Sequence, residues 1–136
     1  MNFSNVIQNL NWLAIISAAI STFLIGGIWY TIFKNSWMSV NGFTEQDLGK
    51  RKMPKVFLLS LFFSLIMSLN LAMFIGNGDL TFGAIAGLLT GLGWVSLSIG
   101  IIALFENRSW KYILINGGYM TLAFTIMGII LGGWKK

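Results

Sequence analysis

Residues 80–105 read LTFGAIAGLLTGLGWVSLSIGIIALF, a run of 26 positions without a charged side chain. The hydrocarbon core of a bilayer is about 30 Å thick, and an α-helix of about 20 apolar residues crosses it. Three further uncharged runs cover residues 1–33, 56–78 and 112–134. Because all four runs exceed this length, the sequence predicts an integral membrane protein with four spans.

The composition excludes a water-soluble domain. The chain is 56% hydrophobic and 10% charged, whereas ordinary globular proteins average about 45–50% and about 25%. It contains no Cys and no His, which excludes disulfides and thiol nucleophiles and removes the commonest general base and metal ligand. We therefore expect neither a metal site nor a cofactor.

The predicted fold class is all-α, an integral membrane four-helix bundle. We place the spans at about residues 11–33, 55–76, 81–105 and 111–133 of a single transmembrane domain, 1–136. The loop at 34–54 is the only sizeable segment outside them. Within it, Thr44-Glu-Gln-Asp47 resembles a capping box that starts a short helix. Pro54 suits the first turn of the second span, where its missing N–H costs nothing.

Basic residues predict the orientation of the chain. The segments 34–55 and 106–111 hold seven Lys and Arg, whereas the opposite side holds only Lys135 and Lys136. Because short cytoplasmic loops are enriched in Lys and Arg, we expect these two segments in the cytoplasm and both termini outside. The same rule explains the net charge of +5, so no nucleic-acid partner is expected. The run Lys50-Arg-Lys52 either lies against anionic headgroups or is a plain determinant of topology.

All four predicted spans carry small residues at a spacing of four. Inside lipid such ridges let helix backbones approach closely, and close packing drives much of helix association. We therefore expect a compact bundle packed along ridges that include Ala14, Ala18, Thr22 and Gly26; Ser60, Ser64, Ser68 and Ala72; Gly83, Gly87 and Gly91; and Gly117, Thr121, Gly128 and Gly132.

Some polar residues do not follow these ridges. Asn70 lies roughly opposite the serine ridge of its span, and Asn116 and Tyr119 share a face mostly away from the glycines of theirs. A buried amide in hydrocarbon is costly unless it is hydrogen-bonded. We therefore predict buried hydrogen bonds at Asn11, Asn70, Asn116 and Tyr119. The partner is within the same bundle, on a second copy of the chain, or a substrate.

Aromatic rings near the span ends are typical of membrane interfaces. The predicted cytoplasmic interface contains Trp29, Tyr30, Trp37 and Trp110, with Glu106 and Arg108 fixing the second inner turn. Trp94, near the middle of its span, is either a bulky lipid- or core-facing residue or a ring that lines a ligand site. The similar segments Ile32–Trp37 and Leu104–Trp110 leave open a duplicated helical hairpin, as in parallel-repeat transporters.

Several short segments together resemble one known family. They are Asn11–Ile16 with Gly26, Trp29-Tyr30 and Trp37; Gly42–Leu48; Leu104–Lys111; Ile115–Tyr119; and the Gly-Gly-Trp134 end. This pattern resembles the domain-of-unknown-function 1761 family over nearly the whole chain. The resemblance implies a small bacterial four-span protein, hence a multi-pass protein of the bacterial cell (inner) membrane, and it carries no activity. Arg108-Ser109 departs from the family, where a small residue and a Pro are expected.

Three functions are compatible with these patterns. We expect a non-enzymatic bundle, an accessory subunit or membrane-organising protein that contacts membrane lipids and works alone, as a homo-oligomer or in a larger membrane complex. The alternative is a small oligomeric transporter or channel for a neutral or weakly polar solute. No acidic residue lies inside a span, which argues against proton-coupled exchange. An enzyme is least expected, since its only candidate groups are the interfacial Glu106, Asp47 and Tyr119.

Overall fold

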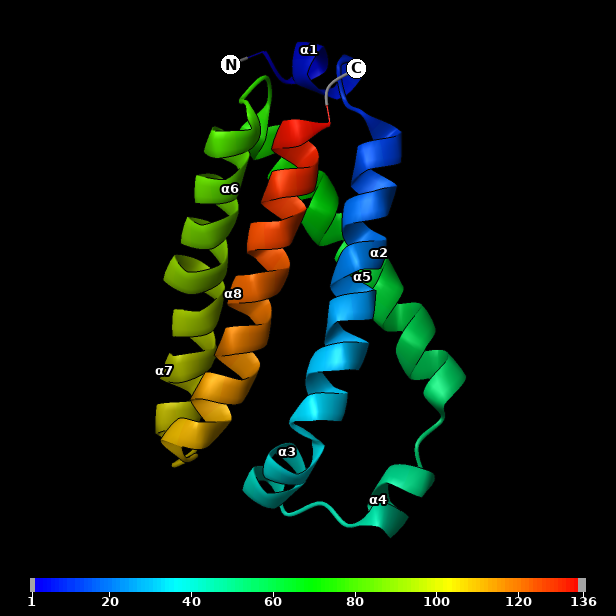
Figure 1. Ribbon diagram of the computed structural model, residues 1–136, viewed down its shortest axis with the longest axis vertical. Helices are drawn as coiled ribbons and strands as arrows, with labels where there is room; N and C mark the ends of the chain where they lie inside the picture. The colour runs from blue at the N-terminus through cyan, green and yellow to red at the C-terminus, as the bar shows by residue number, and fades with distance from the viewer. Residues whose placement is uncertain (1, 135–136) are drawn as a thin grey trace.

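The computed structural model describes residues 2–134 of the chain. In this range four helical segments are long and apolar enough to cross a membrane, and no strand is present. They are α2 (Trp12–Ile32), α5 (Met53–Ile75), the continuous segment Leu80–Phe105 and α8 (Trp110–Gly133). Each begins and ends within two residues of the predicted span. The protein is therefore an all-α membrane protein with four spans (Figure 1).

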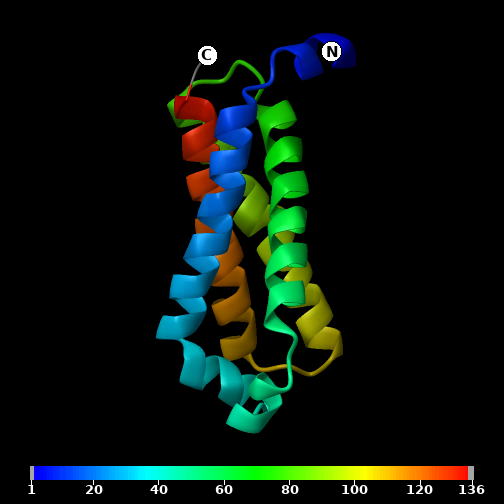
Figure 2. The ribbon, with the colours of Figure 1, turned by 90° about the vertical axis from the view of Figure 1, so that its right-hand side faces the viewer.

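Three short helices lie at the two ends of the bundle (Figures 1 and 2). α1 (Phe3–Gln8) lies at the same end as the last turn of α8, whereas α3 (Lys34–Asn41), α4 (Glu45–Gly49) and the turn before α8 lie at the opposite end. The two basic segments are thus at one end, as the predicted topology requires. Lys135 and Lys136, which that prediction also used, lie outside the described residues.

Side-chain caps explain where several helices begin. Asn11 accepts a hydrogen bond from Ala14 N at the start of α2, and Asp79 accepts one from Phe82 N at the start of the third span. The predicted capping box is confirmed, because the side chains and backbone N–H groups of Thr44 and Asp47 bond reciprocally at 2.8 and 3.1 Å. These caps satisfy N–H groups that a helix leaves without partners.

The predicted small-residue ridges form the core of the bundle. The buried members include Ala14, Ala18 and Thr22 on α2, and Ser64, Ser68 and Ala72 on α5. Packing is closest between α6 (Leu80–Leu88) and α8. A methyl group on Gly83 would collide with the carbonyl oxygen of Gly128, and one on Gly87 with that of Phe124. Glycine therefore lets these two backbones touch.

The third span changes its helical geometry in the middle, which the sequence patterns did not predict. It continues from α6 into a π-helical segment, η1 (Leu89–Ser96), and then into α7 (Leu97–Phe105). Here Trp94 points outward and is 74% exposed. The buried Ser96 donates to the carbonyl oxygen of Gly117 at 2.6 Å and is bonded to the Thr121 hydroxyl at 2.8 Å. The wider helix thus combines an outward ring with a serine bonded to α8.

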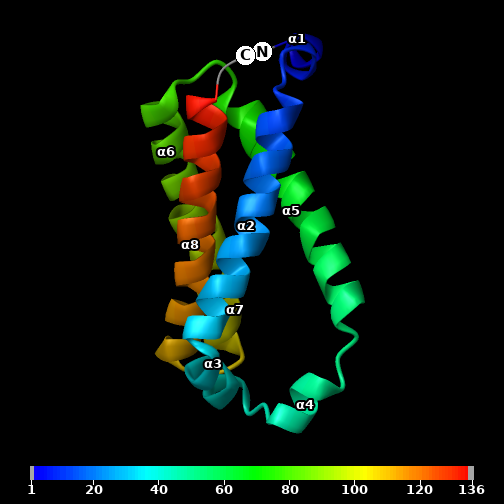
Figure 3. The same cartoon turned by 45° about the vertical axis from the view of Figure 1, so that its right-hand side comes forward.

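α5 lies beside α2 for only half of its length. In the half near α1, the buried Ser68 hydroxyl donates to the carbonyl oxygen of Ile15 at 2.8 Å. Toward α3 and α4, α5 diverges from α2 (Figure 3). The two hairpins therefore pack differently, since α8 follows the third span along its whole length. A common origin of the hairpins stays a prediction.

Candidate functional site

A cleft of about 1040 Å³ separates α2 and α5 in the half of the bundle next to α3 and α4. Its walls are mostly apolar and include the exposed side chains of Leu24, Ile28 and Val56. Phe23 and Phe57 meet edge to face across it, with ring centroids 5.4 Å apart. The cleft opens to the outside of the bundle, between two helices that are long and apolar enough to cross a membrane.

Two tyrosines form the inner surface of this cleft. The Tyr119 hydroxyl donates to the carbonyl oxygen of Thr22 at 2.9 Å, and the Tyr30 hydroxyl donates to Asn116 Oδ1 at 2.6 Å. The two rings are 5.3 Å apart. A methyl group on Gly26 would lie 2.9 Å from the Tyr119 hydroxyl oxygen, so glycine leaves room for that ring. Both hydroxyls hold helices together, and the rings line the cleft.

Arg51 lies where the cleft opens toward α3 and α4. Its guanidinium lies 4.6 Å from the centre of the Phe43 ring and 5.5 Å from that of Trp37. The centre of the Trp37 ring lies 5.3 Å from the centre of the Phe43 ring and 5.8 Å from that of the Tyr30 ring. A continuous set of rings therefore connects the inner surface of the cleft with a cation at its mouth, and cation–π contacts hold that cation in place.

Asp47 lies close enough to Arg51 for their charges to interact. The main cause that lowers the pKa of Asp47 is the hydrogen bond from the backbone N–H of Thr44, followed by the Thr44 hydroxyl and, more weakly, the charge of Arg51. The Asp47 carboxylate thus serves mainly as the cap of α4. Within residues 2–134, the Arg51 guanidinium makes no ion pair and no side-chain hydrogen bond.

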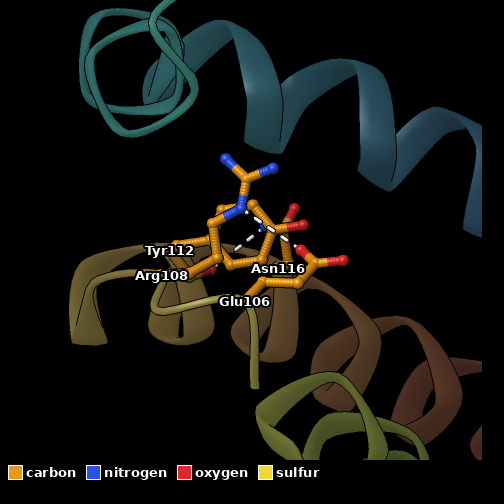
Figure 4. A network of polar contacts seen from close by, with 4 residues as sticks. All are labelled: Glu106, Arg108, Tyr112 and Asn116. Carbon is orange, nitrogen blue, oxygen red and sulfur yellow. Dashed lines mark hydrogen bonds and ion pairs between the residues drawn. The ribbon is translucent and has the colours of Figure 1, made fainter. Parts of the chain in front are cut away.

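A network of polar contacts extends from the turn before α8 into the first two turns of that helix (Figure 4). Glu106 and Arg108, which are predicted to fix this turn, form an ion pair there, with Arg108 Nε 3.3 Å from Glu106 Oε2. The Arg108 guanidinium lies 5.2 Å from the centre of the Tyr112 ring, and Asn116 donates to the Tyr112 carbonyl oxygen at 3.1 Å. Asn116 also accepts from Tyr30. Its predicted partner is thus within the same bundle.

The predicted interface aromatics divide into two groups. Trp29 donates from Nε1 to the carbonyl oxygen of Ile115 at 2.9 Å, and its ring lies against Gly118, so it links α2 to α8. Trp37 belongs to the rings of the cleft. Trp110, by contrast, is 71% exposed at the first turn of α8.

Asn11 is only half-buried; besides capping α2, it donates to the Trp134 carbonyl oxygen at 3.2 Å.

The prediction of a buried Asn70 is wrong. α5 lies at the edge of the bundle, so the side opposite its serine ridge is exposed, and Asn70 satisfies its amide N–H on its own helix, at the Ile66 carbonyl oxygen 2.8 Å away. Asn70, Thr90 and Trp94 line a separate hollow of about 610 Å³ on that exposed side. Trp94 thus faces outward rather than into the core.

The two tyrosines of the cleft are hydrogen-bonded within the bundle, and Arg51 lines the cleft beside them. Among the described residues, no group of three or more acidic, His or Cys side chains could hold a metal ion, and no buried side-chain nitrogen or oxygen lacks a hydrogen bond. No carboxylate lines the cleft. The residues that the sequence patterns missed as part of a site include Gly27, Phe43 and Arg51, and the apolar side chains that form the walls. The one available signal was the basic run around Arg51, which carries no information about the rings beneath it.

Comparisons with known proteins give one match. The model of a family described as "Protein of unknown function (DUF1761)" matches residues 13–132, which confirms the predicted resemblance. No curated protein and no solved structure was found that matches the chain. The matched range contains the cleft and nearly all of the four spans.

Proposed function

The chain belongs to the DUF1761 family, whose description assigns no function, and we propose that it is a non-enzymatic membrane-organising protein that binds an amphiphile of the bilayer between α2 and α5. We place it in the cell (inner) membrane of a bacterium, with both termini outside and the α3–α4 end in the cytoplasm, because seven Lys and Arg lie in the segments at that end. The observation that carries the proposal is the lipid-accessible cleft beside α2.

The size and lining of the cleft support this role. Small-molecule sites measure roughly 300–1,000 Å³ and are mostly apolar with a few polar groups, and this cleft of about 1040 Å³ lies just above that range. A gap between helices within a bilayer is filled by lipid or by another apolar molecule. Apolar walls with a cation at one end fit a molecule that has an apolar chain and a polar head.

An enzyme is disfavoured by the polar groups of the cleft. Nucleophilic catalysis needs a nucleophile that an adjacent base activates. The hydroxyls of Tyr30 and Tyr119 both donate to acceptors within the bundle, and no carboxylate lines the cleft beside them. These tyrosines therefore support binding by their rings and leave no activated group for a reaction.

Transport is the alternative function, and the closed half of the α2–α5 pair argues against it for a single copy. There Ser68 bonds to Ile15, and Leu71 and Ala72 are buried in the core. The cleft thus ends inside the membrane in the part of the chain that the structure describes. A continuous route would need a second copy, whereas holding one amphiphile needs only the cleft.

Two leucine substitutions test the proposed role. Gly27 lines the cleft, and a methyl group there meets no atom within 4 Å, so the side chain of Gly27→Leu starts in open space and narrows the cleft. Gly93→Leu is the matched control, because a methyl group at Gly93 also meets no atom and Gly93 does not line the cleft.

Native mass spectrometry after mild extraction measures the lipid that each variant retains. We expect the original chain and Gly93→Leu to keep bound lipid and Gly27→Leu to lose it. Equal retention in all three would refute binding in the cleft. A co-purified protein in place of lipid would instead indicate an accessory subunit.

A further inference from the structure

We propose that the amphiphile in the cleft is an anionic phospholipid, whose phosphate is bound by Arg51 and whose acyl chain lies between α2 and α5. This inference rests on the proposed function and adds the chemistry of the headgroup. Its first support is the position of Arg51, which lines the same cleft as the apolar side chains of Met53 and Val56. Cation and apolar walls therefore belong to one site.

The contacts of Arg51 leave its hydrogen-bond donors available. Its guanidinium lies over Phe43 and Trp37, and neither ion pair of the described residues uses it. A guanidinium held on aromatic faces still presents a planar fork of N–H groups, which matches the oxygens of a phosphate. Arg108 is different, because its guanidinium is paired with Glu106. Glu106 engages only the Nε of Arg108, so Arg51 is distinguished by its place: of the two arginines, it is the one that lines the cleft.

The surrounding charge favours an anionic headgroup. Residues 34–55 contain five basic and two acidic side chains. Both acids are engaged within the segment, Glu45 with Lys34 at 3.2 Å and Asp47 in the cap of α4. Lys50, Lys52 and Lys55 are neighbours of Arg51 along the chain, and neither described ion pair uses them. The mouth of the cleft is thus positive, and each basic residue near an anionic surface contributes about 1 kcal/mol.

The direction of the cleft also fits a phospholipid. Its cation lies beside α3 and α4 at the end of the bundle, and its apolar walls run from Ile32 and Met53 inward to Phe23 and Ser64. A phospholipid in the bilayer has this order of groups, with the phosphate at the interface and the chains toward the middle. A helix from a second copy would supply apolar side chains, but no acid lies inside any span, and the acids at this end of the bundle, Glu45, Asp47 and Glu106, are each engaged within their own copy.

The test compares two phospholipids that have the same acyl chains but different headgroups. The full-length protein is delipidated in detergent and titrated with phosphatidylglycerol or phosphatidylcholine, and native mass spectrometry gives the ratio of the two affinities. We expect a preference for phosphatidylglycerol that Arg51→Gln lowers about fivefold, which corresponds to the roughly 1 kcal/mol of one basic residue. Arg51→Lys keeps the charge but not the planar fork, and we expect an intermediate ratio.

Lys111→Gln is the matched control, since it removes one positive charge at the same end of the bundle from a residue that does not line the cleft. We expect it to leave the ratio unchanged. Equal effects of Arg51→Gln and Lys111→Gln would overturn the assignment to Arg51. Retention of both phospholipids with equal affinity would overturn the anionic headgroup but leave the proposed function intact. Failure to retain any phospholipid, together with dimers in the spectrum, would overturn both and indicate a second copy in the cleft.

Discussion

The contact between α6 and α8 gives the sharpest prediction about stability. Gly87 is buried, and a methyl group there would collide with the Phe124 carbonyl oxygen and lie 2.9 Å from the carbonyl carbon and 3.0 Å from Thr125 Cα. All three are backbone atoms, so no side-chain rotation relieves the collision. We expect Gly87→Ala to force α6 and α8 apart and to destabilise the protein.

The size of the effect follows from two opposing contributions. Overpacking a well-packed contact costs about 1–3 kcal/mol, whereas alanine is more favourable than glycine within a helix by about 0.5–1 kcal/mol. Gly93→Ala is the matched control on the same span, because its methyl group meets no atom within 4 Å. It gains a similar helix propensity without the collision. The difference between the two variants is therefore expected to be about 1–3 kcal/mol, the overpacking cost alone.

The free energy of unfolding of each variant is measured by circular dichroism as the fraction of sodium dodecyl sulfate in mixed micelles is raised. The expected order of stability is Gly93→Ala at or above the original chain, and Gly87→Ala below it. If both variants unfold at the same detergent fraction, the backbones of α6 and α8 do not touch at Gly87, and the glycine-packing argument is refuted.

Three further predictions concern hydrogen bonds and the cap of α4. Ser68→Ala removes the hydrogen bond from a buried hydroxyl to the backbone of α2. We expect it to lower the free energy of unfolding by about 0.6 and at most about 1.7 kcal/mol. The exposed control Ser98→Ala is expected to show no comparable loss. Tyr119→Phe removes another such bond to α2; we expect a loss of similar size and an unchanged phospholipid preference, and a changed preference would show that the hydroxyl contacts the headgroup. Because hydrogen bonds from Thr44 lower the pKa of Asp47 below its ordinary 3.8, the ionised carboxylate stabilises the start of α4 above that pH. This stabilisation is lost as the pH falls through the lowered pKa. Hydrogen exchange of the Thr44 amide measures the loss. If the amide already loses its protection near about pH 6, ionisation of Asp47 is not what stabilises the start of α4.

The four spans were predictable because the bilayer fixes both their length and their composition. Charged residues lie outside the spans or in the first turn of one, as Lys55 and Lys111 do, and the predicted spans agree with the helices to within two residues. The ridges of Gly83 and Gly128 also identify surfaces that pack closely. They do not identify which ridge meets which, since any two small-residue surfaces can approach. The change to a π-helix at Leu89–Ser96 could not be predicted either, because a pattern that repeats every 3.6 residues describes only an α-helix.

The polar residues were predictable only where their partner lies in the same bundle. Asn116 and Tyr119 share a face of α8, and both are hydrogen-bonded to α2. Asn116 accepts from the Tyr30 hydroxyl, and the Tyr119 hydroxyl donates to the carbonyl oxygen of Thr22. The prediction for Asn70 required a partner in the bundle, on a second copy or on a substrate, but an amide at the edge of the bundle can donate to the carbonyl four residues before it. The contact of Arg51 with Phe43 depends on the path of the chain between α3 and α5, which has no periodicity to interpret.

The closed and open halves of the bundle do not follow from small residues alone, since Gly26, Ser60 and Ser64 line the open half. Because water does not drive helices together inside a bilayer, they approach only where their surfaces fit. α6 and α8 meet through glycines, whereas α5 contains no glycine between Met53 and Ile75. In its first half Phe57 meets Phe23 of α2, so two rings lie between the backbones. Nothing in that half draws α5 closer, and the space it leaves is accessible to lipid. The cleft therefore lies where aromatic rings, rather than small residues, meet between α2 and α5, and Gly27, whose side faces that space, is a position at which a larger side chain would narrow it.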